Sequence, residues 1–243
     1  MLTDENLVRL TPRDSPAAHL VCLPHAGAGV AAFKVWSERV DEDIELIAVR
    51  LPGRESLFQQ TPMRDMAAIG AAVAGVVAGL GGPVGLFGYC AGAFAAFETA
   101  RRMTATPALL AVCSQTAPHR NAPAATVHDL PTPRLKEALR EMGGTEPIVL
   151  EHEEFWEVTE PAIRADYEAA ETYATGTEPR IACDVLAFRG DGDEEVSAKD
   201  AGAWAEVTTG TCTTRPLDGG HFLLRTRATE VLAEVERRLL GRC

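Results

Sequence analysis

The feature that most constrains the fold of this chain is a glycine-flanked turn between a buried strand and a helix. Residues 84–89 are apolar enough for a buried strand, and the alanine-rich residues 91–97 have helical character. The turn reads Gly88-Tyr89-Cys90-Ala91-Gly92, in which glycine relieves the crowding where a strand and a helix come close. The central residue of such a turn is strained, and its reactive atom is exposed. We therefore expect Cys90 at the tip of a central strand.

Strands and helices alternate over most of the 243 residues. This alternation predicts a mostly parallel central sheet covered by helices on both faces, so the expected fold class is α/β. Because no internal repeat or low-complexity tail is visible, residues 1–243 are expected to form one domain. The expected strands are residues 7–10, 19–23, 44–50, 84–89, 108–114, 182–189 and 211–216. The expected helices are residues 31–40, 63–80, 91–103, 134–142, 155–173, 199–208 and 228–240.

The alternation breaks between two of these strands, over approximately residues 121–175. Residues 121–133 are rich in Pro, Ala and Thr and are expected to form a loop. The helical stretches that follow, residues 134–142 and 155–173, predict an inserted lid, with a longer crossover connection as the alternative. Pro161 lies inside the second stretch and should kink it or begin a new segment.

Charge and composition argue against several classes of function. The net charge of −12 disfavours a nucleic-acid-binding surface and adsorption to an anionic membrane. The first residues lack the pattern of a secretory signal, and the most apolar window, residues 67–80, is too short to span a bilayer. Scattered cysteines without paired spacing predict reduced thiols in the cytoplasm rather than a disulfide framework or a metal site. These cysteines are Cys22, Cys90, Cys113, Cys183, Cys212 and Cys243.

Three residues that follow separate expected strands have the chemistry of a catalytic triad: Cys90, Asp193 and His221. The carboxyl ends of parallel strands lie at one edge of a sheet, so these side chains should converge there. His221 would take the proton of the Cys90 thiol, and Asp193 would hold the other ring nitrogen. Asp191 competes for the role of the acid, but the spacing Gly-x-x-Asp-x-x-Val over residues 190–196 favours Asp193.

The oxyanion of a tetrahedral intermediate also needs hydrogen-bond donors. The candidates are the amide of Ala91, directly after the nucleophile, and the amide of Ala26, in the glycine-rich turn after residues 19–23. We expect His25 to organise that turn rather than to act as a second base. Each motif alone also fits an ordinary turn or a packed cysteine, but their joint occurrence in this order predicts a catalytic site.

Five segments resemble the type II thioesterases, which are stand-alone α/β-hydrolases that serve polyketide synthases and nonribosomal peptide synthetases. The similarity runs in order from about Leu20 to Leu224, and the second and fourth segments are more specific to the family than the turn around Cys90. The segments are Leu23-Pro24-His25-Ala26-Gly27, Leu51-Pro52-Gly53-Arg54-Glu55, Gly88-Tyr89-Cys90-Ala91-Gly92-Ala93, Ala162-Ile163-Arg164-Ala165-Asp166-Tyr167 and Gly219-Gly220-His221-Phe222.

The resemblance implies an α/β-hydrolase fold with a nucleophile elbow at Cys90. It implies a thioesterase that acts on an acyl or aminoacyl group carried on the phosphopantetheine arm of a carrier protein, with no cofactor of its own. The lid helices would form the acyl chamber. Carrier proteins are usually acidic, as this chain is, so docking would rely on a local basic patch, for which Arg54, Arg101 and Arg102 are candidates.

The elbow departs from the family pattern, because Tyr89 and Cys90 stand where Gly-His-Ser-x-Gly usually has histidine and serine. A serine ester intermediate commits the acyl group to hydrolysis. An acyl-cysteine is itself a thioester, nearly equal in energy to the pantetheine thioester that it replaces. Three hypotheses therefore stay open: hydrolysis through an acyl-Cys90 intermediate, transfer of the acyl group to another carrier or an amine, and carrier binding without turnover.

Overall fold

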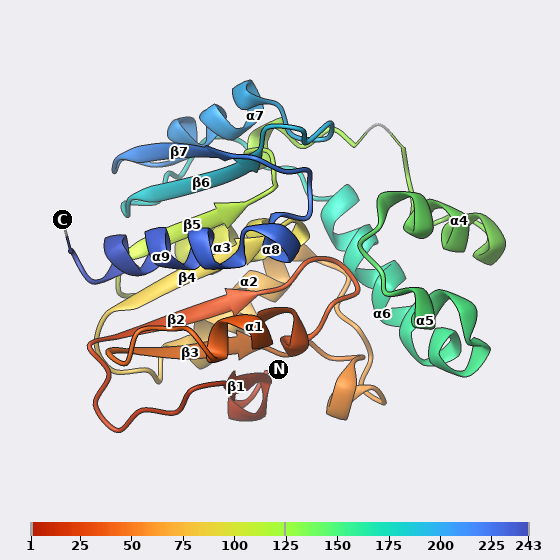
Figure 1. Ribbon diagram of the computed structural model, residues 1–243, viewed down its shortest axis with the longest axis horizontal. Coiled ribbons are helices and arrows are strands. Elements are labelled where there is room, and N and C mark those ends of the chain that lie inside the picture. Colours follow the sequence, from red (N-terminus) through yellow and green to blue (C-terminus); the bar gives the residue numbers. More distant parts are fainter. Residues whose placement is uncertain (1, 124, 243) are drawn as a thin grey trace.

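The strand that precedes Cys90, β4 (Val84–Tyr89), lies in the middle of the central sheet. The computed structural model describes residues 2–123 and 125–242, and over these residues the strand order is β1-β3-β2-β4-β5-β6-β7 (Figure 1). Neighbouring strands run parallel, apart from β1, which is antiparallel to β3. The other strands are β1 (Leu7–Arg9), β2 (Ala18–Leu23), β3 (Ile44–Val49), β5 (Leu109–Cys113), β6 (Val185–Gly190) and β7 (Cys212–Leu217). The predicted mostly parallel α/β sheet is confirmed.

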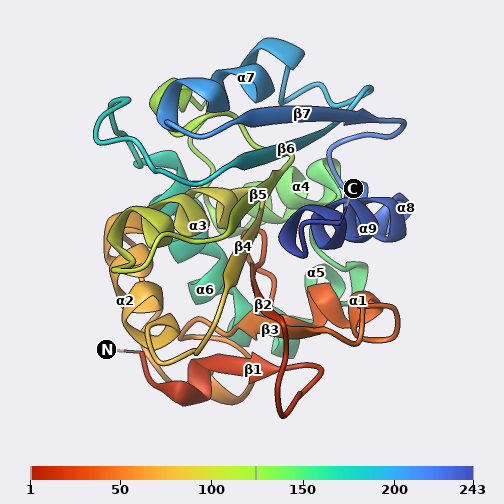
Figure 2. The ribbon, with the colours of Figure 1, turned by 90° about the vertical axis from the view of Figure 1, so that its left-hand side faces the viewer.

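Helices cover both faces of the sheet (Figure 2). On one face, α2 (Met66–Val77) packs against α3 (Ala91–Arg102). On the other face, α1 (Lys34–Ser37) packs against α9 (Ala228–Leu239). Two further short helices, α7 (Ala198–Gly202) and α8 (Leu223–Thr226), follow β6 and β7.

Alternate side chains of β2 enter two separate cores. Val21 and Leu23 belong to the core beneath α2 and α3, whereas Leu20 and Cys22 belong to the core beneath α1 and α9. Because both faces of such a strand are buried, its sequence is a continuous apolar run rather than an alternation. This is why the central strands could be located from the sequence.

The helices α4 (Thr132–Met142), α5 (Pro147–Glu151) and α6 (Glu153–Glu171) stand between β5 and β6 and extend beyond the carboxyl ends of the strands (Figure 1). They occupy the interval 121–175, in which the sequence predicts a lid; their action as a lid stays a prediction. Their apolar side chains form a core of their own, made of Leu135, Leu139, Leu150, Trp156 and Ile163.

The two ends of this insertion are tied together. The Asn121 side-chain amide donates to the carbonyl oxygens of Ala170 at 2.8 Å and Tyr173 at 2.7 Å. The Tyr173 hydroxyl in turn hydrogen-bonds the buried carboxylate of Glu98 in α3. The insertion therefore leaves and rejoins the sheet layer at one place.

Some helix expectations were wrong in detail. Of the two expectations for Pro161, a new segment is not found, because α6 continues through it; Pro161 and Glu157 are exposed, so water can bind the carbonyl that loses its partner, and the expected kink stays a prediction. The helix expected over residues 63–80 is limited to α2, since the Asp65 side chain caps its start by accepting from the Ala68 amide at 2.6 Å. The short helix α5 was not predicted.

Among the described residues, no helix combines the length and the apolar character needed to cross a membrane. Cys22, Cys90, Cys113, Cys183 and Cys212 are unpaired. Cys243, the sixth cysteine, lies outside the described residues.

Close backbone contacts explain the two glycines that flank the elbow. A Cβ atom on Gly88 would lie 2.4 Å from the Ala93 Cα atom. A Cβ atom on Gly92 would lie 2.3 Å from the Leu23 carbonyl oxygen and 2.5 Å from that of Pro24. Real Cβ atoms do not approach backbone atoms this closely, so the turn requires glycine at both positions.

We predict that Gly92→Ala lowers the free energy of unfolding by roughly 2–3 kcal/mol, because the new methyl group overpacks rigid backbone. The matched control is Gly75→Ala in α2, where no atom lies within 4 Å of the added methyl group. That control should stabilise the fold by about 0.5–1 kcal/mol through its higher helix propensity. Urea unfolding followed by circular dichroism measures both, and equal effects of the two substitutions would contradict the prediction.

Candidate active site

The carboxyl ends of β4, β6 and β7 bring Cys90, Asp193 and His221 together. His221 Nδ1 lies 3.1 Å from Asp193 Oδ2 and 3.3 Å from Asp193 Oδ1. Cys90 lies close enough to the ring to help raise the pKa of His221, and both residues line one cavity. The structure thus brings together the three residues that the sequence singles out, in an order that suits a nucleophile, a base and an acid; we call them the relay.

The elbow holds Cys90 in a strained backbone conformation. Its φ of 50° and ψ of −124° place a residue with a side chain in the left-handed region that favours glycine. The Cys90 amide donates to the Cys113 carbonyl oxygen in β5 at 2.9 Å, and α3 begins at the next residue. The thiol therefore projects at a sharp change of direction between strand and helix.

Asp193, rather than Asp191, is the acid that contacts the histidine. The Asp193 side chain is fully buried, and its Oδ1 atom accepts from the amides of Glu195 at 2.9 Å and Val196 at 3.1 Å. Asp191 is exposed and pairs with Arg189 instead. Burial raises the pKa of Asp193, but the hydrogen bonds from His221 and the two amides outweigh it and hold the pKa below its ordinary value.

The surroundings of His221 favour its protonated form. Burial opposes a charge on the ring, yet the hydrogen bonds to Asp193 and Cys90 outweigh burial and raise the pKa of His221 to about 11. The Glu195 carboxylate, 3.9 Å from Nδ1, adds to this effect. A proton that leaves the Cys90 thiol therefore has a strong acceptor beside it.

Two amides are free to receive an oxyanion. Ala91 and Ala26 line the same cavity as Cys90 and His221. Within the residues that the structure describes, neither amide donates to a protein acceptor. Both predicted donors are therefore available to a ligand bound at Cys90.

The cavity at Cys90 has a volume of about 610 Å³, within the usual range for sites that bind small molecules. Its apolar wall comes from α3 and the insertion, and its polar wall comes mainly from the loops after β5 and β6. The apolar wall includes Phe94, Val127, Met142 and Tyr167. The polar wall includes Gln115, Arg120, Glu194 and Glu195.

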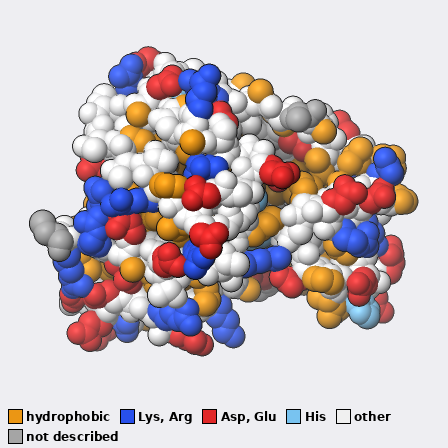
Figure 3. All heavy atoms as spheres, turned by 45° about the horizontal axis from the view of Figure 1, so that its top comes forward, with side chains coloured by type: hydrophobic (Ala, Val, Ile, Leu, Met, Phe, Trp, Pro, Cys, Tyr) orange, Lys and Arg blue, Asp and Glu red, His pale blue; other side chains and the backbone are white. Residues whose placement is uncertain are grey.

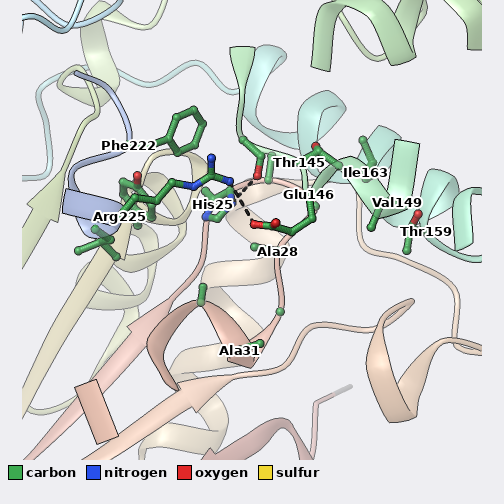
Figure 4. A pocket seen from close by; sticks show the side chains of 17 residues that line it. His25, Ala28, Ala31, Thr145, Glu146, Val149, Thr159, Ile163, Phe222 and Arg225 are labelled. Carbon is green, nitrogen blue, oxygen red and sulfur yellow. Dashed lines mark hydrogen bonds and ion pairs between the residues drawn. The ribbon is translucent and has the colours of Figure 1, made fainter. Parts of the chain in front are cut away.

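A second cavity of about 390 Å³ is lined by His25 and by residues of the insertion (Figure 4). An ion pair between Arg225 and Glu146, with a distance of 3.3 Å from Nη2 to Oε1, links the core to the insertion beside it. His25 Nε2 donates to the Gly144 carbonyl oxygen at 3.3 Å, and the ring packs edge-on against Tyr89 and Phe222. His25 thus belongs to the packing around its turn, and within the described residues it forms no hydrogen bond or ion pair with Cys90, Asp193 or His221.

Of the basic residues that the sequence offers for a docking patch, Arg54 is excluded by its burial, whereas a patch at Arg101 and Arg102 stays a prediction. Arg54 is buried and forms a bidentate ion pair with Asp166. Arg101 and Arg102 both pair with the buried carboxylate of Glu98. On the face that Figure 3 presents, Lys and Arg side chains are interspersed with Asp and Glu side chains rather than gathered in one patch.

Several residues of the site were not singled out from the sequence. Phe94 and Tyr167 wall the cavity at Cys90, and Glu195 lies next to His221. Tyr167 lies in the same family-specific segment as Asp166, but no role was assigned to it. Asp166, in one of the family-specific segments, contacts the turn that carries Ala26. The specificity of that segment was the available signal, but its partner could not be identified without the fold.

Known proteins match this chain over nearly its whole length. The Thioesterase domain family matches residues 18–239. The chain is 32% identical over 238 residues to the thioesterase PikA5 of Streptomyces venezuelae, covering 96% of this chain and 84% of that protein. It is 31% identical over 210 residues to the gramicidin S biosynthesis protein GrsT of Aneurinibacillus migulanus, covering 84% and 82%. The solved structure of the type II thioesterase BorB, from the borrelidin biosynthetic cluster, is 33% identical with a TM-score of 0.90, covering 98% of this chain and 99% of that one. The family that the five segments predict is confirmed.

Removing the charge of the triad acid should slow the reaction of Cys90 with an alkylating reagent. We predict that Asp193→Asn lowers the rate of Cys90 alkylation by iodoacetamide at pH 7 by about tenfold or more, because His221 loses the group that stabilises its protonated form. Asp191→Asn is the matched control and should keep the wild-type rate. Mass spectrometry of the modified protein measures both rates, and equal slowing by the two variants would refute the assignment of the acid.

A pH effect on stability follows from His25, because burial lowers its pKa from the ordinary value of 6.5 to about 4. Between these values the unfolded chain binds a proton that the folded chain does not, so stability should fall as the pH falls from 6.5 to 4. We predict that His25→Gln, which keeps a donor for the Gly144 carbonyl, reduces this loss by up to about 3 kcal/mol. Urea unfolding across pH 4–8 measures the free energy of unfolding of both proteins. The difference between them should be constant above pH 7.5 and should change between pH 6.5 and 4; a difference that stays constant over the lower range would disprove the prediction.

Proposed function

The chain belongs to the thioesterase domain family and is a thioester hydrolase, and on this premise we propose that it removes acyl or aminoacyl groups from the phosphopantetheine arms of carrier proteins in polyketide or nonribosomal peptide biosynthesis. The observation that carries the proposal is the relay from Cys90 through His221 to Asp193, within a cavity that has both apolar and polar walls. The descriptions of BorB and GrsT support this class of pathway.

In the first half-reaction, Cys90 Sγ attacks the carbonyl carbon of the bound thioester, and His221 takes the thiol proton. Asp193 holds the Nδ1 side of the ring, so the proton is received on the side that faces Cys90. The amides of Ala26 and Ala91 donate to the oxyanion. The bond from carbon to the pantetheine sulfur then breaks, His221 returns the proton to that sulfur, and the acyl group stays on Cys90 as a thioester.

In the second half-reaction, a water molecule attacks the acyl-Cys90 carbonyl carbon while His221 takes a proton from the water. The same two amides receive the second oxyanion. When the bond to Cys90 Sγ breaks, His221 returns the proton to the sulfur, which releases a carboxylic acid and restores the thiol. The proposed steps use side chains of this chain and water.

Recognition of the carrier is proposed to depend on its arm more than on long-range attraction between the proteins. The chain has a net charge of −12, and the basic residues once expected to form a patch are paired within the protein. A thioester arm, in contrast, reaches a nucleophile inside a cavity of about 610 Å³. Binding energy from the arm and the acyl group therefore supplies the proposed specificity.

A second candidate function is acyl transfer, and the sulfur of Cys90 is the observation that favours it. Because acyl-Cys90 is a thioester, passing the acyl group to another thiol is nearly thermoneutral. The outcome depends on whether water or a second carrier thiol reaches acyl-Cys90 first. Carrier binding without turnover, the third hypothesis from the sequence, leaves the relay without a use.

The test is to mix the protein with a butyryl-loaded carrier domain and an unloaded holo-carrier, and to follow the intact masses of all three proteins and the release of butyrate. We predict a butyryl adduct on Cys90 and the release of butyrate without gain on the second carrier. Cys90→Ala should abolish both adduct and release. Cys212→Ala, at a half-buried cysteine in β7, is the matched control and should retain them.

Each alternative has a distinct result in the same experiment. Butyryl gain on the second carrier without free butyrate would establish transfer in place of hydrolysis. Unchanged release from Cys90→Ala would exclude Cys90 as the nucleophile. No adduct and no release from the wild-type protein would favour a binding module.

A further inference from the structure

Two family-specific segments take no part in the relay, yet they meet at the turn that carries Ala26. We infer that Asp166 of α6 and Arg54 of the segment after β3 are positioning residues, which hold the Ala26 amide where the oxyanion forms. The inference rests on the proposed function, since it concerns the oxyanion of that reaction. On this inference, the Asp166 side chain of the inserted helix α6 helps to hold the oxyanion hole in place.

Asp166 and Arg54 bind the backbone of the two residues that follow Ala26. The amide of Gly27, the residue after Ala26, donates to Asp166 Oδ2 at 2.8 Å. Arg54 Nη1 donates to the carbonyl oxygen of Ala28 at 2.8 Å. Asp166 therefore fixes the peptide group between Ala26 and Gly27, and Arg54 fixes the peptide group between Ala28 and Gly29.

Asp166 and Arg54 also fix one another. Arg54 Nη1 lies 2.8 Å from Asp166 Oδ2, and Arg54 Nη2 lies 2.7 Å from Asp166 Oδ1, which is a bidentate pair. Both side chains are 7% exposed, so neither head group can exchange its partner for bulk water. Buried paired groups of this kind are rigid, which is what a hydrogen-bond donor for a transition state requires.

A second contact from α6 supports the same turn. Gly27 has a φ of +75°, and a Cβ atom on it would lie 2.9 Å from Ile163 Cγ1. Ile163 lies three residues before Asp166, so both side chains project from one face of the helix. Ile163 packs against Gly27 of the turn, and Asp166 accepts a hydrogen bond from the Gly27 amide.

The charge of Arg54 has a separate consequence for the reaction. A buried carboxylate next to the oxyanion hole would repel the negative charge that develops on the substrate oxygen. The bidentate pair neutralises Asp166, so the acceptor for Gly27 is kept without an opposing net charge. Both members of the pair are therefore needed.

The test separates the oxyanion hole from the nucleophile with two reactions of Cys90. Hydrolysis of a butyryl thioester of N-acetylcysteamine passes through an oxyanion, whereas alkylation of Cys90 by iodoacetamide is a direct displacement that forms none. We expect Asp166→Ala to lower kcat for hydrolysis by about 10²-fold, with KM changed less than threefold and the alkylation rate changed less than twofold. Asp166→Asn keeps an acceptor for the Gly27 amide and should recover part of kcat.

The matched control is Glu168→Ala, because Glu168 lies on the same helix and pairs with Arg64 at an exposed site. It removes an ion pair between α6 and the core without touching the turn, and it should keep wild-type kcat. Should Asp166→Ala fail to fold, Arg54→Lys keeps the charge but loses the bidentate geometry, and it should lower kcat with the alkylation rate unchanged.

Three results would overturn the inference: unchanged kcat in Asp166→Ala, an equal loss in Glu168→Ala, or a loss of alkylation parallel to the loss of kcat. Failure of the proposed function has a different signature. In that case the wild-type protein itself shows no Cys90-dependent hydrolysis, whatever residue stands at position 166.

Discussion

The close approach of α3 to the end of β2 is the constraint on which the site depends. Because Gly92 lacks a side chain, the first turn of α3 lies against the carbonyl oxygens of Leu23 and Pro24. This contact brings the Ala91 amide next to the turn that carries Ala26, so donors from two separate strand ends face one cavity. The relay then needs only the ends of β6 and β7, which the parallel sheet supplies at the same edge.

The convergence of the three candidate residues could be predicted because the position of each is encoded locally, by the strand that it follows. Cys90 directly follows β4, Asp193 and His221 lie a few residues beyond the ends of β6 and β7, and a parallel sheet brings such positions together whatever the lengths of the connections. The central strands were predictable because they are buried on both faces and therefore continuously apolar. The helix α5 was missed because five residues are too few to show a helical period.

Long-range pairing could not be predicted in the same way. An arginine in a loop is usually a solvated charge, and the partner of Arg54 lies 112 residues further along the chain. Glu98, which pairs with Arg101 and Arg102, reads as an ordinary helix-surface residue until α6 and its following Tyr173 cover it. Ion pairs of this kind depend on which elements pack together. A family-specific segment can therefore indicate that a residue is important without identifying the residue with which it pairs.

The Asn121 bonds to Ala170 and Tyr173 give the insertion a property that concerns its evolution. Its two stems are adjacent in space, so closing the segment between them costs little more chain entropy when that segment is lengthened or shortened. The insertion can therefore be replaced as a unit during evolution. Because it forms part of the cavity wall, such a replacement changes which acyl group fits without altering the sheet or the relay. Contacts between the insertion and the core limit this freedom, and Ile163 and Asp166 are among them, because a replacement segment must present the same face to Gly27.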